Sequence, residues 1–367
     1  MKVIYLHQYF KTPSEGGAIR SYYLAKAMVE HGWQVQVITA HDGPEQTTEI
    51  DGIHVHYLSV PYDNSFSTLQ RVKAFRSFSK KAYSIIKKVY KADFIYATST
   101  PLSVGEIALK AQKRLGIPYI FEVRDLWPEA PIQLGVMKNR LMRLYFRRLE
   151  KTIYEQASKL IALSPGIKSG IIETIKGKKI LMAPNMCDMK NFRPSDVNNV
   201  RPKLLYNGAI GKANAPSKII SLVKENPLID FYFMAKGACL QELKDELHSL
   251  ENVTFIPFGS KKELQKVYEE IDITLTSFLD LPVLETCSAN KFFDSLAAGK
   301  VTLVNVGGWM RDLVEKNYCG FYVDGETNLT QLLAPHNLKE LKQNAHNLAS
   351  QFHKDDVCHK VIEFIEK

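Results

Sequence analysis

Several features that would indicate a metal site, a disulfide framework or a membrane span are missing from this 367-residue sequence. Its five cysteines are odd in number, widely spaced and never in a CxxC pair, which favours a reducing compartment and argues against zinc. The ten histidines show no HExxH or other ligand spacing. No run approaches the roughly 18 apolar residues of a spanning helix. The first residues, MKVIYLHQYF, lack the apolar region and cleavage site of a signal peptide, and we expect them to form a buried strand.

Acidic residues are scarce in two segments of the first half of the chain. None occurs in 70–91, which carries eight basic residues, and only Glu150 interrupts the six basic residues of 138–151. The net charge of the whole chain is +9, so its basic character is local. Apolar residues recur at helical spacing in 70–91 and in 138–157, which predicts two amphipathic helices with basic faces.

Two interpretations of these helices are open. Each could be a core helix with a solvated basic face. Alternatively, both could dock on anionic lipid, with about 1 kcal/mol for each basic residue near the surface. We favour the second, and we predict an anionic membrane surface as a partner of 70–91 and 138–157. Nucleic acid is not expected as a partner, because nothing in the sequence resembles a nucleic-acid-reading fold.

Short apolar segments alternate with helical patterns along the whole chain. We predict strands at 3–6, 35–38, 94–97, 119–123, 160–163, 204–207, 231–235, 253–256, 273–277 and 301–305. Because these runs are continuous rather than alternating, they fit parallel strands that are buried on both faces. A segment rich in Pro, Asn and Asp at 182–202 interrupts the series and is interpreted as a linker. The prediction is an α/β chain of two doubly wound, Rossmann-like domains facing a central cleft.

Two glycine-bearing loops precede predicted helices. Gly16 and Gly17 lie before the first helix, and the loop GAIGKANAPSK follows the first strand of the second half, with Lys212 and Asn214 in it. Glycine lets backbone N–H groups approach a phosphate at a helix start, although each loop could also be a turn that needs positive φ.

The segment SANKFFDSLAAGK places a lysine where a helix start would favour an acid. Ser288 is expected to be the N-cap, followed by Ala289 and Asn290, and Lys291 stands where a capping box would have Glu or Gln. Such a lysine is favourable if an anion docks on the same turn. Asp294 lies three residues further on nearly the same face. It would either form a surface pair with Lys291 or bind the two hydroxyls of a ribose, which predicts a nucleotide diphosphate as the ligand.

Five motifs, in this order, resemble those of the retaining, GT-B-fold, family 4-like nucleotide-sugar glycosyltransferases. FEVRDLWPEAP (121–131) is close to a segment of the bacterial surface-polysaccharide branch, which makes O-antigen and capsule. MAPNMCDMKNFRP (182–194) is similar to the family's hinge motif. GAIGKAN, NVTFIPFGSKKEL and NKFFDSLAAGK resemble its successive C-terminal motifs. The resemblance covers essentially the whole chain.

The resemblance implies a set of donor contacts. Gly16 and Gly17 would lie against the donor diphosphate, with Lys212 and Asn214 near the same phosphates. The loop from Pro257 to Gly259 would hold the nucleobase through backbone groups.

Asp294 matches the second acid of the family's E-x7-E motif, which is the ribose ligand. The sequence departs from the family at two places. The first acid position is occupied by Thr286, with Glu285 beside it, and the arginine of the glycine-rich loop is replaced by Ala209. The diphosphate charge would then fall on Lys291, on the loop lysine or on a helix terminus.

Arg124 and Asp125 follow a predicted strand and would therefore face the cleft. An ion pair between them is the simpler role. The alternative is that Asp125 serves as a base or positioning group for the acceptor hydroxyl, with Arg124 tuning it or contacting phosphate. Trp127 would contribute an apolar wall, and Glu122 and Glu129 are weaker candidates. The family precedent is front-side attack without a protein nucleophile, and the absence of an Asp-x-Asp motif predicts no essential Mg²⁺ and no other cofactor.

These observations predict a retaining hexosyltransferase. It would move a sugar of the N-acetylated hexosamine type from a nucleotide sugar, expected to be UDP-linked, to a polyprenyl-diphosphate-linked or other lipid-linked acceptor. Its domains would be 1–185, facing acceptor and membrane, 186–350, binding the donor, and a closing helix at 351–367. It would work in the cytoplasm, peripherally on the inner face of the plasma membrane. The alternatives are a UDP-sugar 2-epimerase of the same fold and a catalytically silent, membrane-docked partner subunit.

Overall fold

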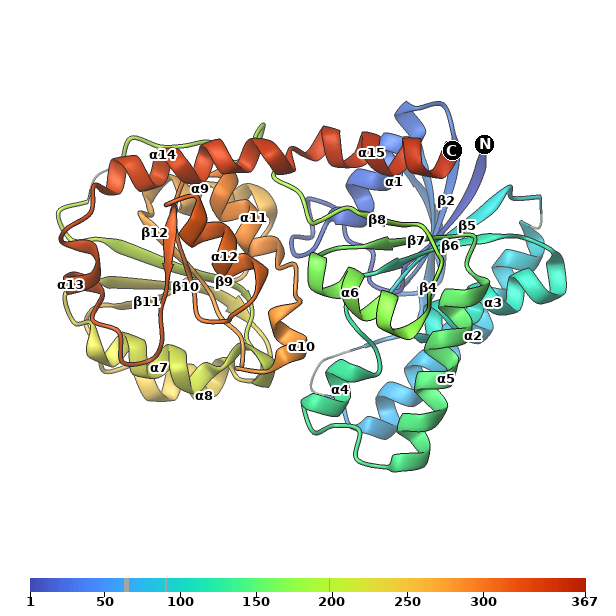
Figure 1. Ribbon diagram of the computed structural model, residues 1–367, viewed down its shortest axis with the longest axis horizontal. Helices are drawn as coiled ribbons and strands as arrows, with labels where there is room; N and C mark the ends of the chain where they lie inside the picture. The colour runs from blue at the N-terminus through green and yellow to red at the C-terminus, as the bar shows by residue number, and fades with distance from the viewer. Residues whose placement is uncertain (63–65, 90, 198) are drawn as a thin grey trace. The chain divides into compact units, whose positions relative to one another are not determined.

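The structure is a computed structural model that divides into two compact units (Figure 1). It describes residues 1–62, 66–89, 91–197 and 199–367. Tyr90 of the basic segment 70–91 and Asn198 of the predicted linker lie outside the described residues. Unit 1 comprises Met1–Thr12, Ala18–Pro184 and Val357–Lys367, and unit 2 comprises Pro13–Gly17 and Asn185–Asp356.

The segment Pro13–Gly17 groups with unit 2 although it lies near the start of the chain. The backbone N–H of Lys261 donates to the carbonyl oxygen of Pro13 at 3.2 Å. The main division falls after Pro184, one residue before the end of the predicted first domain. The C-terminal residues from Val357 onward group with unit 1.

Unit 1 is built on an eight-stranded sheet in the order β3-β4-β2-β1-β5-β6-β7-β8. Among the strand pairs of the described residues, the β3–β4 pair alone is antiparallel. The strands are β1 (Lys2–Leu6), β2 (Gln34–His41), β3 (Gln46–Ile50), β4 (Ile53–Ser59), β5 (Phe94–Thr98), β6 (Tyr119–Val123), β7 (Lys159–Ala162) and β8 (Ile180–Met182). The helices are α1 (Arg20–Glu30), α2 (Thr68–Lys88), α3 (Ser103–Leu115), α4 (Glu129–Gln133), α5 (Arg140–Gln156), α6 (Pro165–Thr174) and the part of α15 (Lys354–Glu366) from Val357 onward.

Unit 2 has a six-stranded, wholly parallel sheet in the order β11-β10-β9-β12-β13-β14. Its strands are β9 (Lys203–Ala209), β10 (Asp230–Lys236), β11 (Val253–Phe255), β12 (Ile273–Thr276), β13 (Val301–Val304) and β14 (Gly320–Tyr322). The helices are η1 (Lys212–Asn214), α7 (Pro216–Glu225), α8 (Leu240–Leu247), α9 (Lys261–Glu270), α10 (Pro282–Glu285), α11 (Asn290–Ala297), α12 (Trp309–Lys316), α13 (Leu329–Leu333), α14 (Leu338–Ala349) and η2 (Ser350–Phe352). In Figure 1, α7 and α8 cover one face of this sheet, and α9, α11, α12 and α14 cover the other.

Both sheets are doubly wound, as expected from the alternation of apolar runs and helical patterns. The strand order reverses between β1 and β5 in unit 1 and between β9 and β12 in unit 2. In such sheets the loops at the carboxyl ends of the strands part at the reversal and leave room for a ligand. The two reversal points are therefore the places to look for functional side chains.

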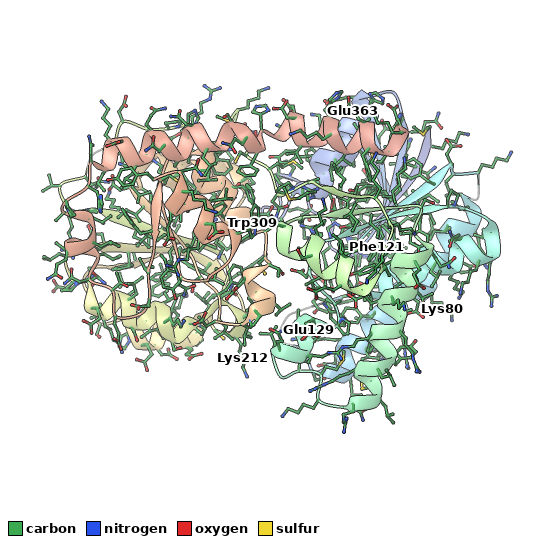
Figure 2. All side chains as sticks on the ribbon, viewed as in Figure 1. Lys80, Phe121, Glu129, Lys212, Trp309 and Glu363 are labelled. Carbon is green, nitrogen blue, oxygen red and sulfur yellow. The ribbon has the colours of Figure 1, made fainter. Side chains whose placement is uncertain are left out.

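The apolar faces of the helices close the cores. In unit 1, α2, α3, α5 and α6 bury one face of the sheet, with Phe121 of β6 fully inside. Figure 2 shows Phe121 in the interior of the unit, whereas Lys80 of α2 is exposed. Among the described residues, no helix has both the length and the apolar character needed to cross a bilayer.

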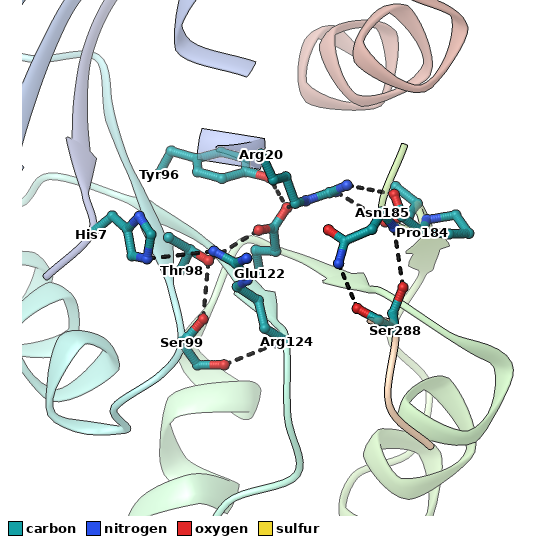
Figure 3. A network of polar contacts seen from close by, with 11 residues as sticks. His7, Arg20, Tyr96, Thr98, Ser99, Glu122, Arg124, Pro184, Asn185 and Ser288 are labelled. Atoms are coloured by element: carbon teal, nitrogen blue, oxygen red, sulfur yellow. Dashed lines mark hydrogen bonds and ion pairs between the residues drawn. The ribbon is translucent and has the colours of Figure 1, made fainter. Parts of the chain in front are cut away.

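A buried ion pair ties α1 to β6 and to the end of unit 1 (Figure 3). The guanidinium of Arg20 donates from Nε and Nη2 to one carboxyl oxygen of Glu122, at 3.0 and 2.9 Å. It also donates to the carbonyl oxygens of Pro184 and Ala183, at 2.5 and 2.9 Å. Both charged side chains are 0% exposed, and Tyr96 donates a further hydrogen bond to Glu122 at 2.7 Å.

Arg20 sets the charge state of Glu122. Burial alone would raise the pKa of Glu122, but the guanidinium outweighs it and holds that pKa below its usual value. The carboxylate's contribution to stability is therefore present above the pKa of the unfolded chain, about 4.3, and is lost as the pH falls through the lower folded-state pKa.

We expect Glu122→Gln to lower the free energy of unfolding of unit 1 by about 3–5 kcal/mol, because it leaves the Arg20 guanidinium buried without a counter-charge. The measurement is chemical denaturation followed by the fluorescence of Trp33 and Trp127. The exposed pair Arg147–Glu129, at 3.1 Å, provides the control. Glu129→Gln should cost less than about 1 kcal/mol. Equal effects of the two substitutions would contradict the role given to the buried pair.

Candidate functional site

The strand reversal of unit 1 collects polar side chains at the carboxyl edge of its sheet. His7 and Gln8 follow β1, Ser99 follows β5, and Arg124 and Asp125 follow β6. Since β1, β5 and β6 are neighbours in the sheet, these loops are adjacent. Figure 3 shows His7, Ser99 and Arg124 within one network.

Asp125 and Arg124 make separate contacts rather than the ion pair that was the simpler expectation. Asp125 accepts a hydrogen bond from the hydroxyl of Thr100 at 2.9 Å. The backbone N–H of Arg124 donates to the hydroxyl of Ser99 at 2.9 Å, and its Nη1 lies 3.4 Å from Nε2 of His7. Both Asp125 and Arg124 are partly exposed. The Asp125 carboxylate is therefore held in place by a hydroxyl and stays accessible.

His7 and Gln8 belong to this edge but were missed from the sequence. Both are buried, and neither the Nδ1 atom of His7 nor either amide atom of Gln8 has a hydrogen-bond partner in the described part of the chain. Burial, reinforced by the charge of Arg124, lowers the pKa of His7 well below its usual value. The neutral imidazole and the amide thus offer unused hydrogen-bonding groups. The signal in the sequence was a polar pair directly after the first apolar run.

Glu122, a weaker candidate, lies in the Arg20 ion pair and is wholly buried, so its contacts are structural. Glu129 pairs with Arg147 at the surface. Trp127 lies against Phe146 of α5, with ring centroids 6.2 Å apart.

The reversal point of unit 2 holds a lysine that forms no ion pair within the described part of the chain. Lys291 stands in the first turn of α11, and its ammonium lies 3.8 Å from the centre of the Tyr206 ring of β9. Its Nζ is buried, and it has no hydrogen-bond partner among the described residues. Burial lowers the pKa of Lys291 to about 7. Gly208, whose φ is +101°, lies next to this lysine. A Cβ at position 208 would be 3.5 Å from Cε of Lys291.

Asp294 does not pair with Lys291, although the three-residue spacing suggested that contact. It accepts from Nζ of Lys261, the first residue of α9, at 2.5 Å, and both side chains are 9% exposed. Burial raises the pKa of Asp294, the charge of Lys261 opposes the rise, and Asp188 adds to it. The ribose role of Asp294 stays a prediction, and Lys261 is a member of the site that the sequence did not reveal.

The start of α11 differs from the expected capping. The N-cap is Ala289 rather than Ser288, the first helical residue is Asn290, and no side chain of the described residues caps the helix. Ser288 instead accepts a hydrogen bond at its hydroxyl from the backbone N–H of Asn185, 3.2 Å away. The side-chain amide of Asn185 donates to the Ser288 carbonyl oxygen at 2.5 Å (Figure 3). Within the described residues, the backbone N–H groups at the start of α11 are therefore not capped by a side chain.

The glycine loop at 16–17 meets the loop at 257–259 within unit 2. A Cβ at Gly16, whose φ is +69°, would lie 2.4 Å from the carbonyl oxygen of Gly259, so only glycine fits there. Gly17, with φ of +85°, faces open space, and Pro257 is exposed. The structure thus brings together two segments that the sequence assigned to the donor independently.

Lys212 and Asn214 have different surroundings. Lys212 is exposed and points away from unit 2 (Figure 2). The amide of Asn214 accepts from Gly211 at 3.0 Å and donates to the carbonyl oxygen of Ser277 at 3.3 Å. Asn214 therefore holds the loop against the end of β12. No cluster of three or more His, Cys, Asp or Glu side chains suited to a metal ion occurs among the described residues.

Residues 15–185 match the model of the glycosyl transferase 4-like domain. No protein of curated function matches the sequence.

Several solved structures match the chain over its full length. The sucrose-phosphate synthase of Thermosynechococcus elongatus has a TM-score of 0.78 at 15% identity, covering 100% of this chain and 98% of that one. HepE of Anabaena, in complex with UDP and glucose, has a TM-score of 0.70 at 16% identity, with coverages of 100% and 99%. WaaG, a glycosyltransferase involved in lipopolysaccharide biosynthesis, has a TM-score of 0.70 at 14% identity, with 99% of each chain covered. The expected α/β fold with parallel sheets, that of GT-B glycosyltransferases, is confirmed.

The low pKa of Lys291 predicts proton uptake on binding a diphosphate. At pH 8 a lysine with a pKa near 7 is about 90% neutral, and an adjacent anion raises the pKa and favours the charged form. We expect binding of UDP at pH 8 to take up roughly 0.5–0.9 proton, measured by calorimetry in buffers of different ionisation enthalpy. Lys291→Met should abolish the uptake. Tight binding of UDP without proton uptake would contradict the assignment.

Proposed function

We propose that this protein is a retaining hexosyltransferase. It transfers a sugar, of the N-acetylated hexosamine type, from a UDP-linked donor to a lipid-linked acceptor at the inner face of the plasma membrane. The product enters cell-surface polysaccharide such as O-antigen or capsule. Unit 2 holds the donor and unit 1 the acceptor.

The observation that carries the donor assignment is the buried ammonium of Lys291. A buried charge is costly without a counter-charge, and this one lies in the first turn of α11, where backbone N–H groups also favour an anion. A diphosphate supplies the missing charge. HepE of Anabaena has been solved with UDP-glucose, and an Escherichia coli protein described as trehalose-6-phosphate has been solved with UDP-2-fluoro glucose. These neighbours support UDP as the nucleotide.

For the transfer step we assign Asp125 to the acceptor hydroxyl. Its carboxylate is partly exposed and is oriented by Thr100, which suits a group that accepts or positions a proton. Arg124 lies beside it and would contact phosphate or tune the acid. The leaving diphosphate would be stabilised by Lys291 and by the start of α11 rather than by a metal.

We expect Asp125→Asn to lower kcat by about 10²–10⁴ while the Kd of UDP changes less than about twofold. The assay measures release of UDP from UDP-N-acetylglucosamine and UDP-N-acetylgalactosamine, with a polyprenyl-diphosphate-linked sugar as acceptor. Asp245→Asn, the same change at an exposed site on α8, is the control. Turnover of the donor without any acceptor would favour a 2-epimerase, and no turnover together with no nucleotide binding would favour the silent subunit.

The surface of α2 and α5 supports two parts of the proposal, the lipid-linked acceptor and docking on the membrane. The first ten residues of α5 are mostly exposed, including Leu141, Met142, Leu144 and Tyr145, which are 78, 44, 46 and 56% exposed. Arg143 lies between them in the sequence, and Arg140, Arg147 and Arg148 flank them. Exposed apolar side chains among cations suit the interface of an anionic membrane.

Leu141→Glu should therefore weaken binding to vesicles of phosphatidylglycerol and phosphatidylcholine by at least about tenfold, because a Leu side chain contributes roughly 1.5–3 kcal/mol when buried and the new carboxylate is repelled. Sedimentation with the vesicles measures this. Leu228→Glu, at a position that is 63% exposed in unit 2, should have little effect. Binding that is unchanged by Leu141→Glu, or equal on vesicles of phosphatidylcholine alone, would argue against membrane docking.

A further inference from the structure

Unit 1 contains a large groove between its protruding helices. Residues of α2, α3 and α5, together with the segment around α4, line a cavity of about 1180 Å³; these helices are seen in Figure 1. Its volume exceeds the roughly 300–1,000 Å³ of an ordinary ligand pocket. The groove therefore has room for a ligand with an extended body.

The wall of the groove is largely apolar and aromatic. Phe75 stacks on Tyr62 at 5.7 Å between ring centres, and Phe146 contacts both Trp127 and Tyr145, at 6.2 and 5.2 Å. All five side chains line the cavity. Such a wall suits a hydrocarbon chain, because transfer of apolar surface from water is favourable and needs no directional contact.

The charge at the groove is almost entirely of one sign. Its lining includes six cationic side chains, Arg71, Arg76, Lys80, Lys87, Lys110 and Lys138. Against them stands one acid among the described lining residues, Glu106. An excess of cationic over acidic side chains in the lining favours an anionic ligand group. The complementary ligand is thus amphiphilic, with an apolar body and an anionic head.

The groove continues from the polar edge that carries Asp125. Pro101 to Ser103 line it and directly follow Thr100, the hydrogen-bond donor to Asp125, and Trp127 lies two residues beyond that carboxylate. The hydroxyl of Ser103 is buried without a hydrogen-bond partner among the described residues. The head group of a bound ligand would thus lie near the residues assigned to the acceptor.

We propose that this groove binds one lipid molecule by its hydrocarbon chain, and that the lipid carries a phosphate or diphosphate head. The inference rests on the proposed function in one respect: it identifies the lipid part of the acceptor. It differs from docking on a bilayer, because a concave groove binds the hydrocarbon chain of one lipid molecule that has left the bilayer. The residues Leu141 and Leu144 of α5, which we assign to bilayer docking, lie outside the groove lining. The cations hold the head group while its sugar remains at the edge near Asp125.

The test uses farnesyl diphosphate as the probe, titrated into the full chain in buffer without detergent or vesicles. Each additional buried methylene should strengthen binding up to about fourfold. We therefore expect farnesyl diphosphate to bind at least about tenfold more tightly than geranyl diphosphate. Farnesol, which lacks the anionic head, should also bind at least about tenfold more weakly. Equal binding of the two diphosphates, or no binding, would overturn the proposal.

Two pairs of matched variants locate the site. Met142→Glu should weaken binding of farnesyl diphosphate at least about tenfold, whereas Leu144→Glu should change it less than about twofold. Both residues lie on α5 at 44 and 46% exposure, but only Met142 lines the groove. Lys80→Gln should weaken binding of farnesyl diphosphate but not of farnesol. Lys88→Gln, at a position on α2 outside the groove lining, should weaken binding of neither compound. Equal effects within either pair would contradict the proposed site.

The Kd of UDP is measured on the same variants. Loss of farnesyl diphosphate binding with UDP binding intact separates the groove from the donor site, as we expect for Met142→Glu. Failure of the wild type to bind UDP, with selective binding of farnesyl diphosphate, would sink the transferase proposal and leave the groove assignment standing.

Discussion

A charge that leaves water for the protein interior needs a counter-charge or hydrogen bonds to replace its hydration. The chain meets this need for Arg20, which binds Glu122 and two carbonyl groups, and for Asp294, which binds Lys261. Among the residues that the structure describes, the ammonium of Lys291 contacts the face of an aromatic ring and has no hydrogen-bond partner. Burial stabilises its neutral form, and an arriving anion would reverse that preference. Arg20 and Asp294 each have a charged partner and Lys291 does not, within the described residues. This difference is the physical basis for placing a diphosphate in unit 2.

Parallel-sheet topology determines where the remaining functional groups can gather. In unit 1 the strand order reverses between β1 and β5, so the loops after β1, β5 and β6 lie together at one edge. Asp125 is held there by a hydroxyl, and the unsatisfied groups of His7 and Gln8 lie after the neighbouring strand β1. The apolar groove begins within two residues of the same loops. An acceptor that carries both a reactive hydroxyl and a lipid tail could therefore place the hydroxyl near Asp125 and the tail in the adjacent groove.

The ten strands predicted from the sequence are all present, because continuous apolar runs are a strong signal for strands buried on both faces. The polar strand at 46–50 and the three-residue strand at 320–322 could not be found this way, since one is largely exposed and the other is too short to form a pattern. The helix carrying Lys291 was predicted, but its cap was not. The hydroxyl of Ser288 instead accepts a hydrogen bond from the backbone N–H of Asn185, which lies 103 positions earlier in the chain. The partner of Asp294 was likewise a tertiary contact, Lys261, 33 positions away, which local spacing cannot reveal.

The central claim is that the buried ammonium of Lys291 is the counter-charge of a nucleotide diphosphate, and it is tested most directly by comparing UDP with UMP in calorimetric titrations. The account predicts that the wild type binds UDP at least about tenfold more tightly than UMP, because a buried charge pair gains several kcal/mol from the added phosphate. Lys291→Met should weaken binding of UDP and largely remove the difference in affinity between UDP and UMP. Equal affinities of the wild type for UDP and UMP, or a difference that survives in Lys291→Met, would contradict it.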